Sequence, residues 1–282
     1  MTPLVAIIAP GAMGSAVAGR LHEHGVRVLT SLSGRSPESA SRARAAGMTD
    51  VPPSELAQAD ILLSIVPPGC AHALAKELAA EFASAAHKPL YVDCNAINPQ
   101  TAARVADIIR AGGMDYVDAG IIGGPPRRGY NGPVFYLSGE YAKQMLALGD
   151  LGLDCRVLTG GPFAASALKM SYAGITKGLT ALASMMIAAA ANAGAAGELR
   201  TELAHSQPGL LAWFERQIPS MFPKAYRWVA EMEEIAGFVK PQPDAEKLFH
   251  AVAGFYRQIA DESGAPDVKI LSGFFAAADR PQ

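Results

Sequence analysis

Lys169 and Tyr172 are the residues of this sequence most suited to proton transfer, and they lie three positions apart. Residues at this spacing share one face of a helix. Both lie near the start of a stretch rich in Ala, Leu and Met, and apolar surroundings disfavour the charged form of a lysine. Such a lysine can serve as the general acid or base when a hydride moves to or from a carbon that bears oxygen. The alternatives are a snorkelling surface lysine and a tyrosine that only packs.

The stretch from Pro162 to Asn192 predicts one long helix, because a proline at its first turn is followed by no further proline. A helix of this length measures about 46 Å. It is apolar nearly all round, which predicts burial from more than one side. Lys169 and Lys177 lie where a membrane span has to be uncharged. We therefore interpret the stretch as a central helix that joins two domains.

A glycine-containing turn follows the first predicted strand, Leu4 to Ala9, and precedes a helical pattern over 15–24 and a strand over 26–32. In such a unit, Gly11 lets the backbone approach a pyrophosphate, and Gly14 lets helix and strand pack closely. The first glycine of the G-x-G-x-x-G pattern is replaced by Ala9. The unit predicts a dinucleotide site, with an ordinary turn as the alternative. The expected cofactor contacts are Ala9, Gly11, Ala12, Met13 and Gly14.

The segment after the second strand bears on the choice of cofactor. An NAD-binding protein carries an Asp or Glu here for the ribose hydroxyls, but residues 31–36 contain no acid. Arg35, with serines on either side, suits a 2′-phosphate through charge-assisted hydrogen bonds. NADP is therefore favoured over NAD, through Ser31, Ser33, Arg35 and Ser36. The alternative is that Arg35 is solvated and Ser36 only caps the next helix.

The remaining elements predict an α/β fold with a doubly wound parallel sheet. Apolar runs at 61–66, 90–93 and 116–118 alternate with helical patterns at 70–85 and 99–111. A last hairpin-like pair, Val134–Ser138 and Cys155–Leu158, flanks a helix near 140–149. We expect a dinucleotide-binding Rossmann domain at 1–160 and an all-helical domain for substrate and dimerisation at 161–282. The expected later helices are 199–206, 209–217, 225–239 and 245–263, with breaks at Pro219, Pro223 and Pro241 and fraying over 278–282.

The composition excludes several classes of protein. Formal net charge is −2, and Arg127-Arg128 is the longest basic run, so we expect no nucleic-acid partner. The apolar start lacks a basic region, which argues against a signal peptide. Three cysteines without a close pair predict neither disulfides nor a metal site. We expect a cytoplasmic protein without a membrane partner, and a helix-end or surface role for His205.

The order of these motifs resembles the β-hydroxyacid dehydrogenases related to 6-phosphogluconate dehydrogenase, over nearly the whole chain. The family's opening G-x-G-x-M-G resembles residues 9–14, and its strand end resembles residues 65–68. Its D-x-S-T-x-x-P segment beside the nicotinamide resembles 93–99, its substrate segment D-A-P-V-S-G-G resembles 118–124, and its lysine motif matches Gly160 and Lys169. The resemblance implies cofactor contacts from Val66, Pro67 and Asn95, and substrate contacts from Ile122, Gly123 and Gly124.

The departures from this pattern point to a divergent subgroup with a C-terminal helical domain of unknown function. The family serine that anchors the substrate's carboxylate falls on Ile122, and the asparagine after the lysine falls on Tyr172 or Ala173. A family Lys-Asp pair falls on Glu231 and Met232. Trp228 and Glu231 share a helix face and are candidate substrate contacts, and an acid there would suit an amine or imine.

Three functions follow from these patterns. The leading one is an NADP-dependent oxidoreductase of a small hydroxy or oxo compound, with Lys169 as general acid/base. The second is a reductase of imines or iminium ions, which needs no carboxylate anchor. The third is a non-catalytic NADP sensor, against which the retained Lys169 argues. The apolar residues 178–191 also predict a homodimer through the helical domain.

Overall fold

The computed structural model describes residues 2–261 and 264–276. The chain divides into two compact units, Met1–Met170 and Ser171–Gln282. This division falls inside the long helix. The first turns of the helix belong to the first unit because they pack on its sheet, where a Cβ added at Gly120 would lie 2.8 Å from the carbonyl oxygen of Ala165.

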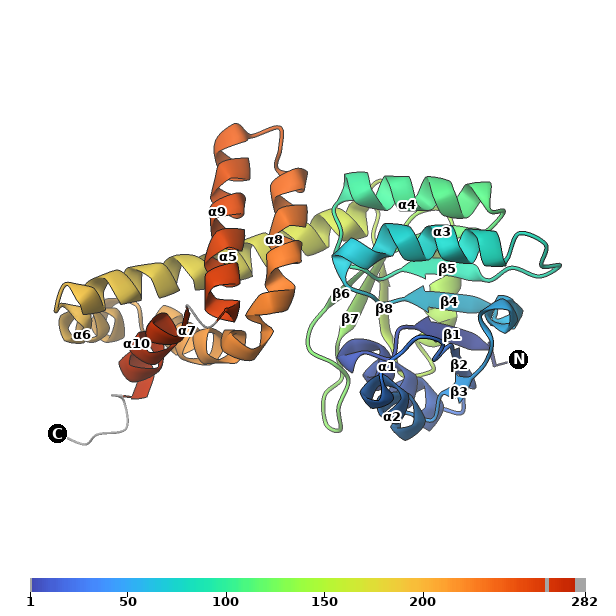
Figure 1. Cartoon of the computed structure of the whole chain (residues 1–282), viewed down its shortest axis with the longest axis horizontal. Helices are drawn as coiled ribbons and strands as arrows, with labels where there is room; N and C mark the ends of the chain where they lie inside the picture. The colour runs from blue at the N-terminus through green and yellow to red at the C-terminus, as the bar shows by residue number, and fades with distance from the viewer. Residues whose placement is uncertain (1, 262–263, 277–282) are drawn as a thin grey trace. The chain divides into compact units, whose positions relative to one another are not determined.

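The first unit is built on one eight-stranded sheet of order β3-β2-β1-β4-β5-β6-β7-β8 (Figure 1). The first six strands pair in parallel, as predicted, and β7 is antiparallel to β6. The strands are β1 Val5–Ile8, β2 Val28–Thr30, β3 Thr49–Asp50, β4 Ile61–Ser64, β5 Leu90–Asp93, β6 Tyr116–Ile122, β7 Val134–Ser138 and β8 Asp154–Val157.

The expected hairpin of Val134–Ser138 with Cys155–Leu158 is wrong. β7 and β8 pair in parallel, because the chain between them crosses back through the short 3₁₀ helix η3 (Ala142–Leu148). The antiparallel partner of β7 is β6, which precedes it in the chain. The loop 123–133 that joins β6 and β7 therefore starts at the end of the sheet where the parallel strands terminate.

Helices cover both faces of this sheet (Figure 1). Alternate strand residues face opposite ways: Val5 and Ile7 join one apolar cluster, and Ala6 and Ile8 join the other. The first cluster includes residues of α1 and α2, and the second includes residues of α3 and α4. The bounds are α1 Ala12–Glu23, α2 Pro37–Ala45, η1 Pro53–Gln58, η2 Pro68–Cys70, α3 Ala71–Glu81 and α4 Pro99–Ala111. Burial on both faces explains the continuous apolar runs of the central strands.

The second unit is all-helical, as expected. Its described elements are the remainder of α5 (Ala164–Asn192), α6 Ala196–Ser206, α7 Pro208–Met221, η4 Phe222–Lys224, α8 Ala225–Phe238, α9 Pro243–Ala260 and α10 Ala265–Ala276. Pro219 does not break a helix but lies in the last turn of α7, and the break falls at Pro223. The helix α10 was not predicted, and the expected fraying over 278–282 lies outside the described residues.

The long helix α5 begins at Ala164, two residues after Pro162, and continues unbroken to Asn192. Within the described chain it is the one helix whose length and composition would allow it to cross a membrane. A core helix of a soluble protein meets the same two criteria. Its burial is one-sided in the chain: Ile187 is buried, whereas Ile175 is 70% and Met186 is 59% exposed.

Candidate active site

The glycine turn has the geometry that a dinucleotide site requires. Gly11 is the N-cap of α1, and no described atom lies within 4 Å of the place that its Cβ would take. A Cβ at Gly14 would lie 2.1 Å from the carbonyl oxygen of Ala9, so α1 packs on the end of β1 more closely than any side chain allows. The open backbone at Gly11 and the start of α1 can therefore face a pyrophosphate, together with Ala12 and Met13.

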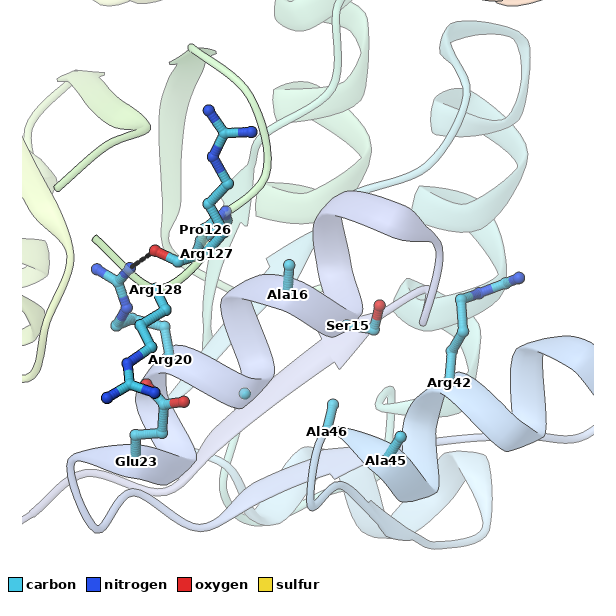
Figure 2. A pocket seen from close by; sticks show the side chains of 11 residues that line it. Ser15, Ala16, Arg20, Glu23, Arg42, Ala45, Ala46, Pro126, Arg127 and Arg128 are labelled. Atoms are coloured by element: carbon cyan, nitrogen blue, oxygen red, sulfur yellow. Dashed lines mark hydrogen bonds between the residues drawn. The ribbon is translucent and has the colours of Figure 1, made fainter. Parts of the chain in front are cut away.

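An arginine that the sequence did not single out braces this turn. Arg42 on α2 donates from Nε to the carbonyl oxygen of Pro10 at 3.1 Å, and its guanidinium also bonds Glu38 at 2.6 Å. Arg42 lies at one end of a pocket of about 710 Å³ between α1, α2 and the loop after β6, and Arg20 lies at the other end (Figure 2). Arg42 and Pro10 are 32 positions apart in the sequence, so no local sequence pattern predicts this role of Arg42.

A second pocket, of about 520 Å³, follows the end of β2 and is lined by Ser31, Ser33 and Asp50 among others. The Oγ of Ser31 is buried and has no hydrogen-bond partner among the described residues, so it can bond a ligand hydroxyl. Arg35 is exposed two residues after Ser33, and it is not among the described residues that line this pocket. Ser36 accepts a hydrogen bond from the backbone N–H of Ser39 at 3.2 Å and caps α2. The hydroxyl groups of Ser31 and Ser33 in this pocket fit the ribose end of a dinucleotide.

Asp50 adds an acid to this pocket that the analysis of residues 31–36 missed. It comes from β3, and its Oδ1 accepts a hydrogen bond from the backbone N–H of Leu32 at 2.9 Å. The pairing of β2 with β3 brings it there. Its negative charge opposes a 2′-phosphate and would suit ribose hydroxyls, so it competes with the effect of Arg35.

Asn95 ties the ends of β4 and β5 together. Its Oδ1 accepts from the backbone N–H of Val66 at 2.7 Å, and its amide nitrogen donates to Ser64 at 2.9 Å and to Asp93 at 2.7 Å. The side chain is buried. Both amide hydrogens are therefore used within the protein, and Asn95 shapes the Val66–Pro67 edge of the site. Whether it also contacts the cofactor remains a prediction.

Two buried carboxyl groups lie side by side in register on β5 and β6, namely Asp93 and Asp118. Desolvation raises the pKa of Asp93 to about 7, against the hydrogen bonds from Asn95 and Tyr116 that lower it. Desolvation also raises the pKa of Asp118, whereas its bonds from Ser166 and Ser138 lower it. Asp93 and Asp118 are the first residues of the family segments at 93–99 and 118–124, but neither was assigned a role from the sequence.

Asp118 fixes the start of α5. Its carboxylate accepts from the Oγ of Ser166 at 2.5 Å, from the backbone N–H of Ser166 at 2.9 Å and from Ser138 at 2.9 Å. A carboxylate at a helix N-terminus interacts favourably with the helix dipole. One turn further along, the Nζ of Lys169 donates to the carbonyl oxygen of Ile121 at 2.8 Å. The network therefore places the Lys169 amine at the carboxyl end of β6, next to Ile122, Gly123 and Gly124.

The other predicted residues belong to the second unit. Tyr172 is 49% exposed, and its catalytic role remains a prediction. Trp228 and Glu231 do share a face, since both contact Lys177: the amine pairs with the Glu231 carboxylate and lies 4.8 Å from the centre of the Trp228 ring. The buried Glu231 therefore has a cationic partner, which the sequence reasoning did not identify.

The comparisons with known proteins agree with this geometry. Residues 4–147 match the model of the NAD binding domain of 6-phosphogluconate dehydrogenase, just over half of the chain. The chain belongs to this family and is an oxidoreductase with a nicotinamide dinucleotide cofactor, as the sequence predicted. Residues 190–259 match a domain of unknown function, DUF1932, in the predicted helical domain. No protein of curated function matches the sequence.

Solved structures share the fold over almost their whole length. The conserved protein MTH1747, of unknown function and similar to 3-hydroxyacid dehydrogenases, is 28% identical, with a TM-score of 0.67 over 91% of this chain and 99% of its own. The 3-hydroxyisobutyrate dehydrogenase of Mycobacterium tuberculosis is 17% identical, with a TM-score of 0.73 over 99% of this chain and 100% of its own. The imine reductase of Myxococcus stipitatus in complex with NADP⁺ is 16% identical, with a TM-score of 0.58 over 96% of this chain and 99% of its own.

Proposed function

We propose that this protein is an NADP-dependent oxidoreductase that transfers a hydride between the nicotinamide and a small hydroxy or oxo compound. The observation that carries the proposal is the fixed position of the Lys169 amine at the carboxyl end of β6. Ligands of open α/β sheets bind at this end of the strands. The NADP preference rests on Ser31 and Arg35, and Asp50 opposes it.

The roles of the residues follow from their positions. The bound nicotinamide supplies or accepts the hydride. The turn at Gly11–Gly14 holds the pyrophosphate, and Asn95 holds the Val66–Pro67 edge in place. Lys169 gives a proton to the substrate oxygen in reduction, or takes it in oxidation, so that one hydride and one proton convert C=O to CH–OH. Gly124 leaves the backbone open beside it, because no described atom lies within 4 Å of the place that its Cβ would take.

An imine or iminium reductase is the second candidate, and Ile122 favours it. An isoleucine cannot bond a substrate carboxylate, and a C=N compound needs no such anchor. With an imine, the same hydride step reduces the carbon while the proton goes to nitrogen; with an iminium ion, the hydride alone gives the amine. The fold shared with the Myxococcus stipitatus imine reductase agrees with this candidate, although that similarity concerns the fold alone.

Binding and turnover experiments separate these candidates. NADPH and NADH are titrated by the change in their fluorescence, and hydroxy acids, ketones and cyclic imines are then tested with each cofactor. We expect Lys169→Ala to retain NADPH affinity and to lose at least about a hundredfold in kcat. Lys76→Ala, an exposed lysine on α3, is the matched control. Full turnover by Lys169→Ala would refute the assignment, and binding without any turnover would favour an NADP sensor.

We also propose a cytoplasmic homodimer formed through the helical unit. Ile175, Leu182 and Met186 are 70%, 53% and 59% exposed, and their spacing places them in one stripe along α5. An exposed apolar stripe of this kind suits a second copy of the same helix. Light scattering coupled to gel filtration should give a dimer, and Leu182→Asp should give a monomer. A wild-type monomer at micromolar concentration would contradict this proposal.

A further inference from the structure

The loop from Gly123 to Pro133 is folded back on the end of β6. The backbone N–H of Tyr130 donates to the carbonyl oxygen of Arg127 at 3.1 Å, and Gly129 between them has a φ of +75°. A left-handed residue of this kind turns the chain sharply and favours glycine. The Arg127 guanidinium lies 5.6 Å from the centre of the Tyr130 ring. The turn directs Tyr130 back toward the start of the loop.

Arg20 of α1 clamps this turn in place. Its guanidinium donates to the carbonyl oxygens of Tyr130 at 2.9 Å, Arg127 at 3.2 Å and Gly152 at 3.3 Å. Figure 2 shows the bond from Arg20 to Arg127. The residues in these contacts are more than a hundred positions apart in the sequence, so Arg20 attaches the far end of the loop to the Rossmann core. The side chain of Tyr130 is consequently held in one place and partly buried.

The Tyr130 hydroxyl lies where a side chain of residue 123 would be. A Cβ built on Gly123 would be 2.5 Å from this oxygen, and a Cβ built on Gly132 would also be 2.5 Å from it. Both glycines therefore make room for the tyrosine. Among residues 2–261 and 264–276, this hydroxyl has no hydrogen-bond partner. The hydroxyl therefore lies beside Gly123, which follows Ile121 and Ile122 in the chain. The carbonyl oxygen of Ile121 accepts a hydrogen bond from the Lys169 amine.

We propose that the Tyr130 hydroxyl is a substrate-contacting group and supplies the hydrogen bond that Ile122 cannot make. The inference rests on the proposed function, because it takes the end of β6 as the substrate site. A phenol is uncharged and can both donate and accept a hydrogen bond. It suits a substrate with a neutral hydroxyl, carbonyl or amine group close to the reacting carbon.

The test is Tyr130→Phe, which removes only the hydroxyl, compared with Tyr136→Phe on β7 as the matched control. NADPH affinity is measured first, and kcat and KM follow for each compound that the wild type turns over. We expect unchanged NADPH affinity and a roughly tenfold lower kcat/KM for Tyr130→Phe, with wild-type values for Tyr136→Phe. Wild-type kcat/KM in Tyr130→Phe would overturn the inference and leave the proposed function intact.

Two further readouts separate contact with the substrate from support of the loop. Trypsin cleaves after exposed arginines, and Arg127 and Arg128 are exposed in this loop. An unchanged cleavage rate in Tyr130→Phe, together with the lower kcat/KM, supports direct contact; faster cleavage would overturn it. Adding Ile122→Ser to Tyr130→Phe should restore several-fold of the lost kcat/KM. A wild type that binds NADPH but reduces no compound would overturn the proposed function as well.

Discussion

The buried carboxyl of Asp93 gives the most quantitative prediction. Desolvation raises its pKa in the folded protein to about 7, from an ordinary value of 3.8. The folded protein therefore keeps this proton between about pH 4 and pH 7, whereas the unfolded chain gives it up. Stability falls as pH rises across that window, and it changes no further above it. At 1.36 kcal/mol per pH unit, the difference of roughly three units corresponds to about 4 kcal/mol.

Asp93→Asn isolates this contribution. An asparagine oxygen can still accept from the backbone N–H of Asn95, and its amide can donate to the Tyr116 hydroxyl oxygen, but it does not titrate. Urea unfolding is followed by far-UV circular dichroism at pH 5, 6, 7 and 8, with variant and wild type compared at each pH. The variant should gain stability relative to the wild type as pH rises, by about 3 kcal/mol between pH 5 and pH 8.

A control variant at an exposed carboxylate tests whether the pH effect is specific to Asp93. Asp150→Asn removes an exposed carboxylate of the same unit and should leave the pH dependence parallel to that of the wild type. A constant difference between Asp93→Asn and wild type across the four pH values would show that Asp93 is ionised throughout. The conclusion that burial at the end of β5 raises the pKa of Asp93 would then be wrong.

Three further predictions concern the cofactor site and the helix start. Gly14→Ala places a methyl group 2.1 Å from the Ala9 carbonyl oxygen, so it should cost about 1–3 kcal/mol in urea unfolding and weaken NADPH binding; unchanged binding would contradict the packing role. Asp50→Asn keeps an acceptor for Leu32 but removes a charge, so fluorescence titration should show a several-fold shift toward NADPH; an equal effect on NADH would refute it. Asp118→Asn weakens the bonds that start α5, so kcat should fall while NADPH affinity stays within about twofold, and equal losses in both would point to general unfolding.

Local sequence patterns were sufficient for much of the first unit. The strand–turn–helix pattern around Gly11 and Gly14 depends on neighbouring residues, and the packing of Gly14 on Ala9 confirms it. The helix at 99–111 was also predicted at its observed bounds, and the structure shows that Asn98 caps it and Pro99 starts it. Such signals lie within a few positions of each other, where spacing determines geometry.

Contacts between distant positions were not predicted. Asp50 on β3 accepts a hydrogen bond from Leu32, because β3 pairs with β2. Arg42 on α2 donates to the carbonyl oxygen of Pro10, which precedes α1. Lys177 on α5 forms an ion pair with Glu231 on α8. The parallel pairing of β7 with β8 depended likewise on the path of the connecting chain. Each of these requires the tertiary fold, since neither propensity nor periodicity determines which distant side chains meet.

The central claim is that the Lys169 amine handles the proton beside the nicotinamide. A crystal structure of the protein with NADPH tests it most directly, because the amine and the ring then appear in one map. The account predicts the ring at the carboxyl ends of β1, β4 and β5, with the Lys169 amine facing its reactive carbon across the space for one small substrate. A ring bound elsewhere, or an amine directed into bulk water away from the ring, would contradict it.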